Sequence, residues 1–298
     1  MRWRLDQLEA LVWISRLGSF RAAAKRLNVS QPAVSGRIRE LERQTGAKLI
    51  DRSQLRPRIT RRGAEIIRYA EQIIRIGEHL TAHLKSKEAL VGTIRMGVAD
   101  SFAVTHLAPL LERFAKLHPA ASVELDVGFS ANLERKLRAA ELDVAFLHAP
   151  VPGPDLAIEP LLEYELAWFA SPRLNLSKAI LRPADLADIP VLSNPEPSHL
   201  YGTIMDWFGT AGLAAHRINT CSSLSIITKL AVDGFGVALL PVALVEAELR
   251  NHALRRLRTK PELPPSRLTV AYRKHSEIGD LAIVVQLARE LVQAREAT

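Results

Sequence analysis

Residues 18–42 read GSFRAAAKRLNVSQPAVSGRIRELE and predict two short helices joined by a tight turn. Ser19 can cap the first helix, Phe20–Leu27, because its hydroxyl can accept a hydrogen bond from a free backbone N–H group. Ser30 can cap the second helix, and Pro32 lies in its first turn, where the missing proline N–H costs nothing. Apolar residues recur at helical spacing in the second helix, namely Val34, Ile38 and Leu41. A polar first turn with nearby arginines is what a helix needs to enter a DNA major groove.

The sequence on either side of this helix pair favours the same interpretation. A preceding amphipathic helix can brace the pair through Leu5, Leu8, Leu11, Val12 and Ser15. After the pair come two short extended runs, Lys48–Arg52 and Arg56–Thr60, with a basic tip between them, which are typical of a wing that lies along the phosphate backbone. Because short motifs have low specificity, a helical hairpin with a solvated basic face is the alternative interpretation of the helix pair taken alone.

This segment resembles the LysR-type transcriptional regulators. The positions that carry the resemblance are Leu8, Ser19-Phe20, Ala23-Ala24, Leu27, Ser30 to Ser35, Ile38, Leu41-Glu42, Gly46, Leu49, Arg52, Thr60 and Gly63. The resemblance implies an N-terminal winged helix-turn-helix domain. The family's usual Leu-Phe before the wing is Leu49-Ile50 here, a substitution within the core. The wing, residues 53–58, is rich in arginine, which is expected to alter the balance of phosphate and minor-groove contacts.

The residues expected to contact double-stranded DNA form two groups. Those expected at the groove are Ser30, Gln31, Pro32, Ser35 and Arg37. Those expected on phosphates are Arg39, Arg52, Arg56 and Arg58. Contacts to base edges specify the sequence, whereas phosphate contacts position the protein.

The positive charge of the chain lies in its N-terminal segment. The formal net charge is +8 over 298 residues, but residues 1–88 contain 19 Lys and Arg against 9 Asp and Glu, and the remainder contains 21 against 23. A basic module on a near-neutral body is typical of a polyanion-binding domain joined to a sensing domain. A membrane-surface role would need a basic amphipathic helix with large apolar residues on one face, whereas these basic residues are spread over a compact helical unit.

Targeting signals and cysteine content restrict the setting further. No apolar run approaches the length of a membrane-spanning helix, and the N-terminal MRWRLDQLEAL lacks the apolar core of a signal peptide. We therefore expect a cytoplasmic protein without membrane contact. Cys221 is the only cysteine, which excludes an intramolecular disulfide and a cysteine metal cluster. It is expected to be a small buried side chain, with a role as a lone redox sensor as the alternative.

Residues 63–87 contain no proline and carry a heptad-like apolar seam, which predicts one long helix. The seam consists of Ile66, Ala70, Ile73, Gly77, Leu80 and Leu84. Such a stripe is buried either within the same chain or against a second copy. The family resemblance implies the second copy, and two recognition helices about one DNA turn apart would read a two-fold-related site. We expect a homodimer or homotetramer, with Ile73→Asp breaking the helix pairing.

Residues 91–298 alternate strands with helices, which indicates parallel α/β units in two lobes. The expected strands are 93–98, 122–127, 142–147, a strand beginning at 161–169, 189–192, 236–240 and 267–272. The expected helices are 102–117, 133–140, 201–210, 223–233, 242–249 and 278–296. Two such lobes with a return helix predict a cleft between them.

Three stretches of this region resemble the effector domain of the same family, which is similar to periplasmic binding proteins. They are Phe114 with His118-Pro119, residues 142–145 and residues 231–241. The resemblance implies two crossovers between lobes, placed near Glu163-Tyr164 and near 265–267. The expected fold class is α+β multidomain, with a winged helix-turn-helix at 1–62, a linker helix at 63–90 and a two-lobed α/β domain at 91–298. Lobe I is expected to comprise 91–163 and 267–298, and lobe II to comprise 164–266.

Small ligands bind beyond the carboxyl ends of strands in such sheets. The residues expected to hold a small-molecule effector are Ser101, Phe102, Phe129, Ser130, His148, Ser193, Asn194, Ser222 and Ser223. Each serine is equally suited to cap a helix. Ser101 is the strongest candidate because its match lies where the family's effector binds, and the two phenylalanines would wall the pocket. The expected ligand is a small polar or anionic metabolite. His148 either adds a pH-dependent charge or is a strand-end histidine with satisfied hydrogen bonds.

We therefore expect a sequence-specific transcriptional regulator of the LysR type, whose DNA binding or promoter activation responds to a small effector of unknown identity. RNA polymerase is included among the expected partners. The alternatives are a cytoplasmic enzyme or a solute-binding protein on the same two-lobed fold. The sequence contains no nucleophile elbow and no Walker-type phosphate loop, and His79 and His83, which have metal-ligand spacing, lack a third ligand of clear spacing. We therefore expect no catalysis, cofactor or metal. The basic N-terminal segment and the missing signal peptide argue against a solute-binding protein.

Overall fold

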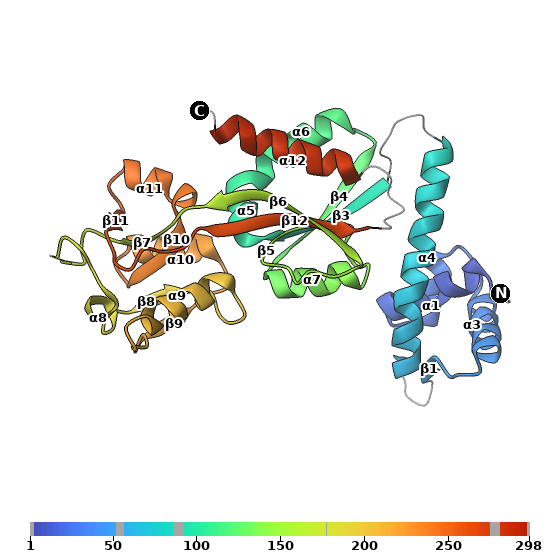
Figure 1. Cartoon of the computed structure of the whole chain (residues 1–298). Coiled ribbons are helices and arrows are strands. Elements are labelled where there is room, and N and C mark those ends of the chain that lie inside the picture. Colours follow the sequence, from blue (N-terminus) through green and yellow to red (C-terminus); the bar gives the residue numbers. More distant parts are fainter. Residues whose placement is uncertain (1–2, 52–56, 86–91, 177, 275–280, 297–298) are drawn as a thin grey trace. The chain divides into compact units, whose positions relative to one another are not determined.

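The computed structural model describes residues 3–51, 57–85, 92–176, 178–274 and 281–296. The chain divides into two compact units, Met1–Gly92 and Thr93–Thr298, and each has its own hydrophobic core (Figure 1). Within the described ranges, no helix combines the length and the apolar character that crossing a bilayer requires.

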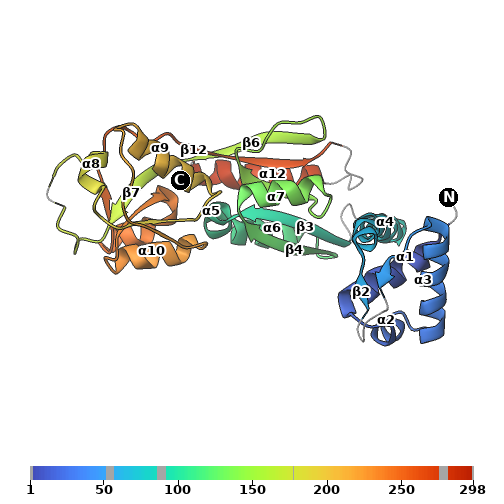
Figure 2. The same cartoon turned by 90° about the horizontal axis from the view of Figure 1, so that it is seen from below.

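The N-terminal unit is a winged helix-turn-helix, as the sequence predicts. Its helices are α1 (Leu5–Leu17), α2 (Phe20–Arg26), α3 (Gln31–Thr45) and α4 (Arg61–Lys85), and its antiparallel strands are β1 (Ile50–Asp51) and β2 (Arg58–Ile59). The hydroxyl oxygen of Ser19 accepts a hydrogen bond from the Ala22 N–H at 3.4 Å, and that of Ser30 accepts one from the Ala33 N–H at 3.3 Å. Figure 2 views α4 nearly along its axis, with the shorter helices gathered beside it.

The wing is fixed to the helices by two side chains. The Glu42 carboxylate accepts hydrogen bonds from the backbone N–H groups of Leu49 at 2.9 Å and Ile50 at 3.2 Å. The Thr60 hydroxyl oxygen accepts a hydrogen bond from the Gly63 N–H at 3.0 Å. The base of the wing is therefore attached to α3 on one side and to the start of α4 on the other.

The apolar seam of α4 packs against its own unit. Ala70 is fully buried, and Ile66 and Ile73 pack against the same core that α1 and α3 share. Within the chain this stripe therefore closes its own domain, and because Ile66 and Ile73 are only partly buried, their pairing with a second subunit stays a prediction. Among the described side chains of α4, the large apolar ones that are exposed are Tyr69, 64% exposed, and Ile76, 45% exposed, which lie one heptad apart. The side chains of the seam residues Leu80 and Leu84 lie outside the described residues.

The first sheet of the C-terminal unit has the strand order β4-β3-β5-β12-β6. Its strands are β3 (Gly92–Ala99), β4 (Ala121–Gly128), β5 (Val144–His148), β6 (Leu156–Tyr164) and β12 (Ser266–Arg273). Figure 1 shows α6 (Ala108–Leu117) and α12 (Leu281–Glu296) over one face of this sheet and α7 (Ser130–Arg138) over the other.

The second sheet has the order β11-β7-β10-β8-β9. Its strands are β7 (Leu166–Ala170), β8 (Val191–Ser193), β9 (Ile218–Thr220), β10 (Val237–Pro241) and β11 (Arg255–Leu257). Figure 2 shows α9 (His199–Gly209) and α10 (Leu224–Val232) on opposite faces of it. Two shorter helices are α8 (Pro183–Leu186) and α11 (Glu246–Arg250). Trp168, Phe169 and Phe208 are fully buried in its core.

The chain passes between the two sheets at two places. β6 of the first sheet ends at Tyr164 and β7 of the second begins at Leu166; the return occurs between Leu257 and Ser266. The sequence analysis places these crossings near Glu163-Tyr164 and near residues 265–267.

Several elements differ from the sequence expectation. The sheets are mixed rather than parallel, because β12 runs antiparallel to β5 and β6, and β7 runs antiparallel to β10 and β11. The strand expected to open lobe II is two strands, of which β6 belongs to the first sheet. The helix expected over 102–117 begins as α5 (Asp100–Phe102), continues as a π-helix (Ala103–Leu107) and only then becomes α6. Pro109 near the start of α6 has no N–H to continue an α-helical ladder. The helix expected over 242–249 is a short 3-10 turn, Val242–Leu244, followed by α11.

Candidate DNA-binding surface and effector pocket

The first turn of α3 presents the side chains that the sequence analysis places at a DNA groove. Ser30, Gln31 and Pro32 are exposed, and Ser35 is half-buried one turn further along. Val34 on the inward side is fully buried, so the orientation of this turn is fixed by the core. The helix-turn-helix therefore offers a small, polar and exposed helix start.

Arg37 and Arg39 project from α3 in different directions. Arg37 is half-buried, and its Nε lies 3.3 Å from Oδ2 of Asp6, so an ion pair holds it within the unit. Arg39 is exposed and forms no ion pair with a described residue. Because successive helical residues turn by about 100°, Arg39 shares a side of α3 with Ser35, whereas Arg37 lies about 160° from Ser35. A groove contact by Arg37 therefore requires Asp6 to release it.

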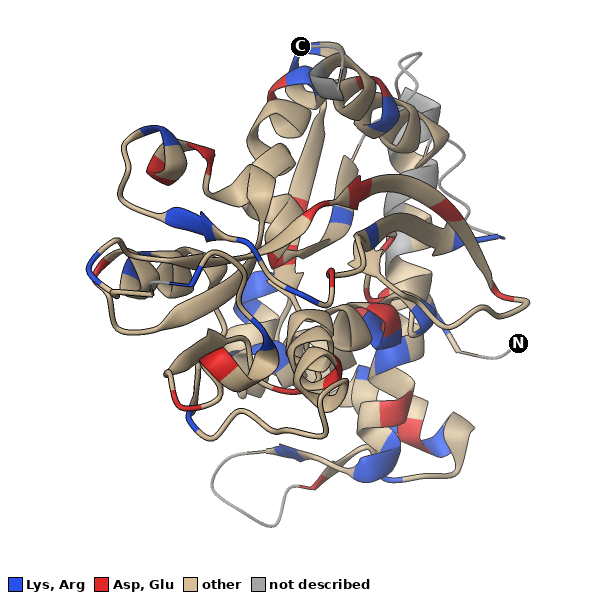
Figure 3. Ribbon diagram, turned by 60° about the vertical axis from the view of Figure 1, so that its left-hand side comes forward, with Lys and Arg blue, Asp and Glu red and all other residues tan. Residues whose placement is uncertain are grey.

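Several other arginines of this unit form ion pairs with glutamates, so charge alone does not identify the DNA-facing side. The pairs are Arg16 with Glu71 at 2.9 Å, Arg43 with Glu40 at 2.5 Å and Arg62 with Glu65 at 3.0 Å. Figure 3 shows both basic and acidic residues on the helices. Arg58 is exposed on β2, whereas the predicted contacts Arg52 and Arg56 lie outside the described residues.

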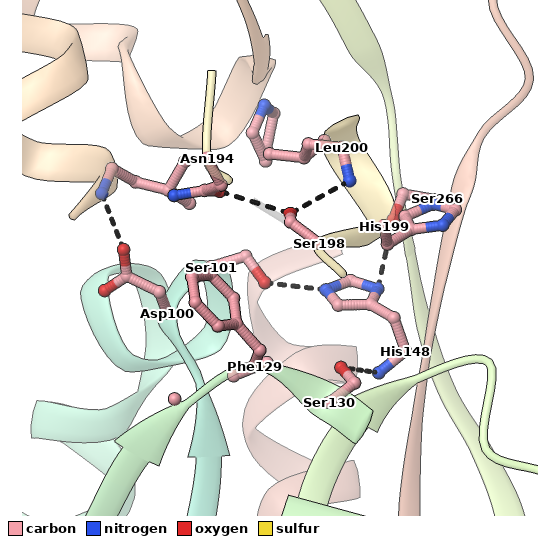
Figure 4. Close-up of a pocket in the computed structure, with 14 residues that line it drawn as sticks. Asp100, Ser101, Phe129, Ser130, His148, Asn194, Ser198, His199, Leu200 and Ser266 are labelled. Atoms are coloured by element: carbon pink, nitrogen blue, oxygen red, sulfur yellow. Dashed lines mark hydrogen bonds between the residues drawn. The ribbon is translucent and has the colours of Figure 1, made fainter. Parts of the chain in front are cut away.

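A small pocket lies in the C-terminal unit, between residues of the two sheets (Figure 4). The predicted residues that line it are Ser101, Phe129, Ser130, His148 and Asn194. Lining residues that the sequence analysis does not select include Asp100, Ser198, His199, Leu224 and Ser266. Its volume is about 40 Å³, far below the roughly 300–1,000 Å³ of typical small-molecule sites. The pocket as it stands is therefore too small for a metabolite-sized ligand.

His148, at the end of β5, is the centre of the pocket's hydrogen bonds (Figure 4). Its Nδ1 lies 3.1 Å from the Arg267 carbonyl oxygen and 3.0 Å from the Ser266 hydroxyl. Because a carbonyl oxygen only accepts, Nδ1 carries the proton, and Nε2 accepts a hydrogen bond from the Ser101 hydroxyl at 2.8 Å. Burial, with a smaller effect from His199, lowers the pKa of His148 from its ordinary 6.5 to about 4. The ring is therefore neutral at pH 7.

Two further contacts arrange the polar groups around this ring. The backbone N–H of His148 donates to the Ser130 hydroxyl oxygen at 2.9 Å. Across the pocket, the Leu224 N–H at the start of α10 donates to Oδ2 of Asp100 at 2.6 Å, which joins the second sheet's helix to the end of β3. The Asn194 amide donates to the Cys221 carbonyl oxygen at 3.0 Å. Side chains from both lobes are therefore held in place around the pocket.

Phe102 does not wall the pocket. It is fully buried in the first lobe, where its ring stacks on Phe146 with centroids 4.5 Å apart. The expectation is wrong because one step along a helical turn rotates the side chain by about 100°, so that Ser101 faces the pocket and Phe102 faces the core.

The structure does not bring three predicted serines to the pocket. Ser193 is buried in β8, and its hydroxyl has no hydrogen-bond partner among the described residues. Ser222 is exposed, and Ser223 precedes α10 without a side-chain capping hydrogen bond. The Asp100 carboxylate caps this helix start instead. Cys221 is half-buried against the core of the second sheet.

Comparison with known families decides the identity of the chain. A family model described as "Bacterial regulatory helix-turn-helix protein, lysR family" matches residues 5–64, and one described as "LysR substrate binding domain" matches residues 87–293. The chain is a LysR-type transcriptional regulator. A relative named "Probable RuBisCO transcriptional regulator" from Emiliania huxleyi is 28% identical to this LysR-type regulator over 255 residues, covering 82% of this chain and 81% of the relative.

Solved structures show the same fold as this LysR-type regulator. ArgP from Mycobacterium tuberculosis superposes with a TM-score of 0.75 at 22% identity, covering 96% of both chains. Full-length CbnR, solved in complex with its target DNA, gives a TM-score of 0.71 at 20% identity and covers 97% of this chain and 99% of that one.

The Ser101–His148 pair of this regulator also resembles part of a hydrolase triad, but its surroundings differ. In a triad a carboxylate supports the histidine and strengthens it as a base. Here Nδ1 of His148 faces the Arg267 carbonyl and the Ser266 hydroxyl, and burial has lowered the pKa of His148 to about 4. The pair therefore differs from a triad in that no carboxylate among the described residues bonds to Nδ1, and burial makes the histidine a weaker base.

We expect the stability of the regulator's C-terminal unit to fall as the pH drops from 6.5 towards 4. In that window the unfolded chain protonates His148 and the folded chain does not, so protons favour unfolding. The contribution of His148 is present above pH 6.5 and is at most about 3 kcal/mol. Urea unfolding at several pH values should show a flatter dependence for His148→Gln than for the wild type. Equal slopes for the two proteins would contradict the assignment.

Proposed function

We propose that this regulator binds a two-fold-related DNA site as a homodimer and that a small polar molecule in the pocket changes that binding. The observation that supports the proposal best is that polar groups of both lobes meet in the pocket, with Asp100 bonded to the Leu224 N–H between them. A ligand that touches both lobes favours one separation of the lobes over another. Such differential contact is what coupling between two sites requires.

In this proposal α3 reads bases and the arginines bind phosphates. Ser30, Gln31, Pro32 and Ser35 lie in the groove, because they form the exposed, polar start of α3. Arg39 and Arg58 bind phosphates, and Arg37 joins the interface only when it leaves Asp6. Arg52 and Arg56 of the wing remain predicted phosphate contacts.

The proposal is tested by incubating the purified full-length protein with fragmented DNA from its source and sequencing the fragments retained at moderate salt. A few enriched sites with an inverted repeat support it. Uniform retention that disappears with added salt contradicts it, because it reveals electrostatic binding alone.

Arg39→Ala should weaken binding to all DNA sequences alike, and it should reduce the slope of log affinity against log salt concentration by about 1. The reason is that Arg39 is exposed on the Ser35 side of α3 and has no ion-pair partner among the described residues. Arg43→Ala is the matched control, since Glu40 already neutralises Arg43 at 2.5 Å. Fluorescence anisotropy between 50 and 200 mM salt (about the range over which phosphate contacts dominate) measures both effects. A change in discrimination between sites would assign Arg39 to bases instead.

The dimer in this proposal forms through the exposed face of α4. Tyr69 and Ile76 are large, apolar and solvent-exposed one heptad apart, whereas the neighbouring Ala70 is buried in the unit's own core. The double variant Tyr69→Asp, Ile76→Asp should be monomeric by light scattering at micromolar concentration. Arg68→Asp, on a different side of the helix, should remain dimeric. Ile73→Asp should instead destabilise the N-terminal unit. A dimer that survives the double variant would place the subunit contact elsewhere.

A second subunit contact would convert dimers into tetramers. β4 is an edge strand of the first sheet and exposes Leu125 and Val127, and Leu117 is exposed at the end of α6. Exposed apolar edge strands are prone to pair with other chains. We assign this edge to contact with another copy, and RNA polymerase remains a further proposed partner at promoters. A regulator that acts on DNA works in the compartment that holds the DNA, which fits the expected cytoplasmic location.

A further inference from the structure

The charges around the pocket favour one class of effector, on the premise that the proposed effector pocket is correct. Among the described lining residues, Asp100 is the acidic side chain, and no lysine or arginine is present. His148 and His199 add no positive charge at pH 7, because burial lowers the pKa of both rings. Asp100 is therefore the charged side chain of the described lining at pH 7, and no lysine or arginine is there to pair with an anionic ligand.

Asp100 keeps one carboxylate oxygen for a ligand. Its Oδ2 accepts the Leu224 N–H at 2.6 Å, and no described hydrogen bond occupies Oδ1. The residue is half-buried, so the solvent screens this charge less than at an open surface. A group that carries hydrogen-bond donors and positive charge would complete the shell of this carboxylate.

Ser101, next to Asp100 in the chain, offers an acceptor as well. Its hydroxyl hydrogen points to Nε2 of His148, because Nδ1 of the same ring donates to the Arg267 carbonyl oxygen. The oxygen of Ser101 therefore presents only lone pairs to the pocket. Figure 4 shows Asp100 and Ser101 side by side at the end of β3.

Ser130 has the opposite polarity. Its oxygen accepts the His148 backbone N–H at 2.9 Å, which leaves its hydroxyl hydrogen available to donate. The pocket therefore has two neighbouring acceptors on one wall and a donor on the adjacent strand end. This arrangement distinguishes the two ends of a small ligand.

We propose that the effector presents an ammonium group to Asp100 and Ser101 and a hydrogen-bond acceptor, such as a carboxylate or hydroxyl oxygen, to Ser130. The effector class is thus a small amine, amino alcohol or amino acid, and a compound whose only charge is negative is rejected. An ammonium group supplies three donors, which matches the two acceptors with one donor to spare for water or backbone. Of the two ligand types expected from the sequence, polar or anionic, the pocket selects the polar type.

The test measures binding of matched compounds to the purified full-length regulator by calorimetry and thermal shift. Three pairs are compared: L-alanine with L-lactate, L-lysine with hexanoate, which lacks both amino groups, and 2-aminoethanol with ethylene glycol. At least one amine should bind, and its partner without the amine should bind about tenfold more weakly or worse. Asp100→Asn keeps an oxygen for the Leu224 N–H but removes the charge, so it should lower the affinity for the amine by a similar factor. Asp188→Asn is the matched control because Asp188 is exposed and lies outside the pocket lining.

A second variant keeps the test independent of any folding defect in Asp100→Asn. Ser101→Ala removes the acceptor without changing the charge and should also weaken the amine, while the melting temperature of each unliganded variant reports its folding. If the bound compounds are carboxylates without an amine, or if Asp100→Asn leaves amine affinity unchanged, the ammonium assignment is wrong but the pocket stands. If no amine of the set binds, the assignment is also wrong. If compounds bind to the Ser101→Ala and Ser130→Ala variants as tightly as to the wild type, the pocket itself is not the effector site and the proposed function fails.

Discussion

Replacing Gly63 by alanine is expected to destabilise the N-terminal unit by about 3 kcal/mol or more. A Cβ atom at Gly63 would lie 2.2 Å from the Leu49 carbonyl oxygen and 2.9 Å from Cγ2 of Ile59. The Leu49 backbone cannot move away easily, because its N–H donates to Glu42 and its carbonyl accepts the Thr60 N–H at 3.0 Å. The new methyl group would therefore force α4 away from the wing. Urea unfolding followed by hydrogen exchange would assign the loss to this unit.

Gly36→Ala is the control for this prediction. Gly36 lies inside α3, and a Cβ built there meets nothing within 4 Å. The substitution should stabilise the same unit by up to about 1 kcal/mol, because alanine favours a helix interior. Protection of α4 amides that stays at the wild-type level in Gly63→Ala would show that the close approach to Leu49 is not needed for the fold.

The helix-turn-helix could be predicted because its signals are local. The caps at Ser19 and Ser30, the proline at position 32 and the apolar spacing of α3 each act within one or two turns, and each helix begins where they indicate. The function of the α4 seam could not be predicted in the same way. An apolar stripe has the same sequence whether its partner is another helix of the chain or a second subunit.

The sheets were predicted less completely because their partners lie far apart in the sequence. β12 pairs with β5 and β6, more than a hundred residues away, and such pairing leaves no local signal of direction. β6 also contains Pro160, a residue that is disfavoured within strands and that makes the segment look like a loop in the sequence. An edge strand tolerates proline because one side of its backbone has no partner strand.

The pocket was partly predictable, because some of its residues have local sequence signals and others do not. Ser101, Ser130 and His148 follow strands of one sheet and could be found by position along the chain. Ser266 and His199 reach the pocket only because the chain crosses between lobes, and nothing near them in the sequence indicates this. Asp100 had a usable signal, since it directly follows β3 beside Ser101 and supplies a charge where the ligand is expected.

Phe102→Ala is expected to be the most destabilising single change in the C-terminal unit among those considered, at about 3–5 kcal/mol. Phe102 is fully buried and stacks on Phe146 at 4.5 Å and on His106 at 5.2 Å. Removing its ring leaves a cavity that the neighbouring rings cannot fill without leaving their own contacts. The midpoint of urea unfolding of the C-terminal unit measures the loss.

Phe129→Ala is the matched variant, because Phe129 is half-buried and lines the pocket. It should change stability by no more than about 1 kcal/mol, since a partly exposed ring leaves little cavity, and it should act mainly on ligand affinity. Phe102→Ala should weaken the ligand as well, although its ring lies outside the pocket, because the Ser101 carbonyl oxygen accepts the Thr105 hydroxyl at 2.7 Å within the same turn. A loosened turn would no longer hold the Ser101 oxygen beside Asp100. If Phe129→Ala proved the more destabilising of the two, the packing of the Phe102 ring would not be the main support of the turn that carries Ser101.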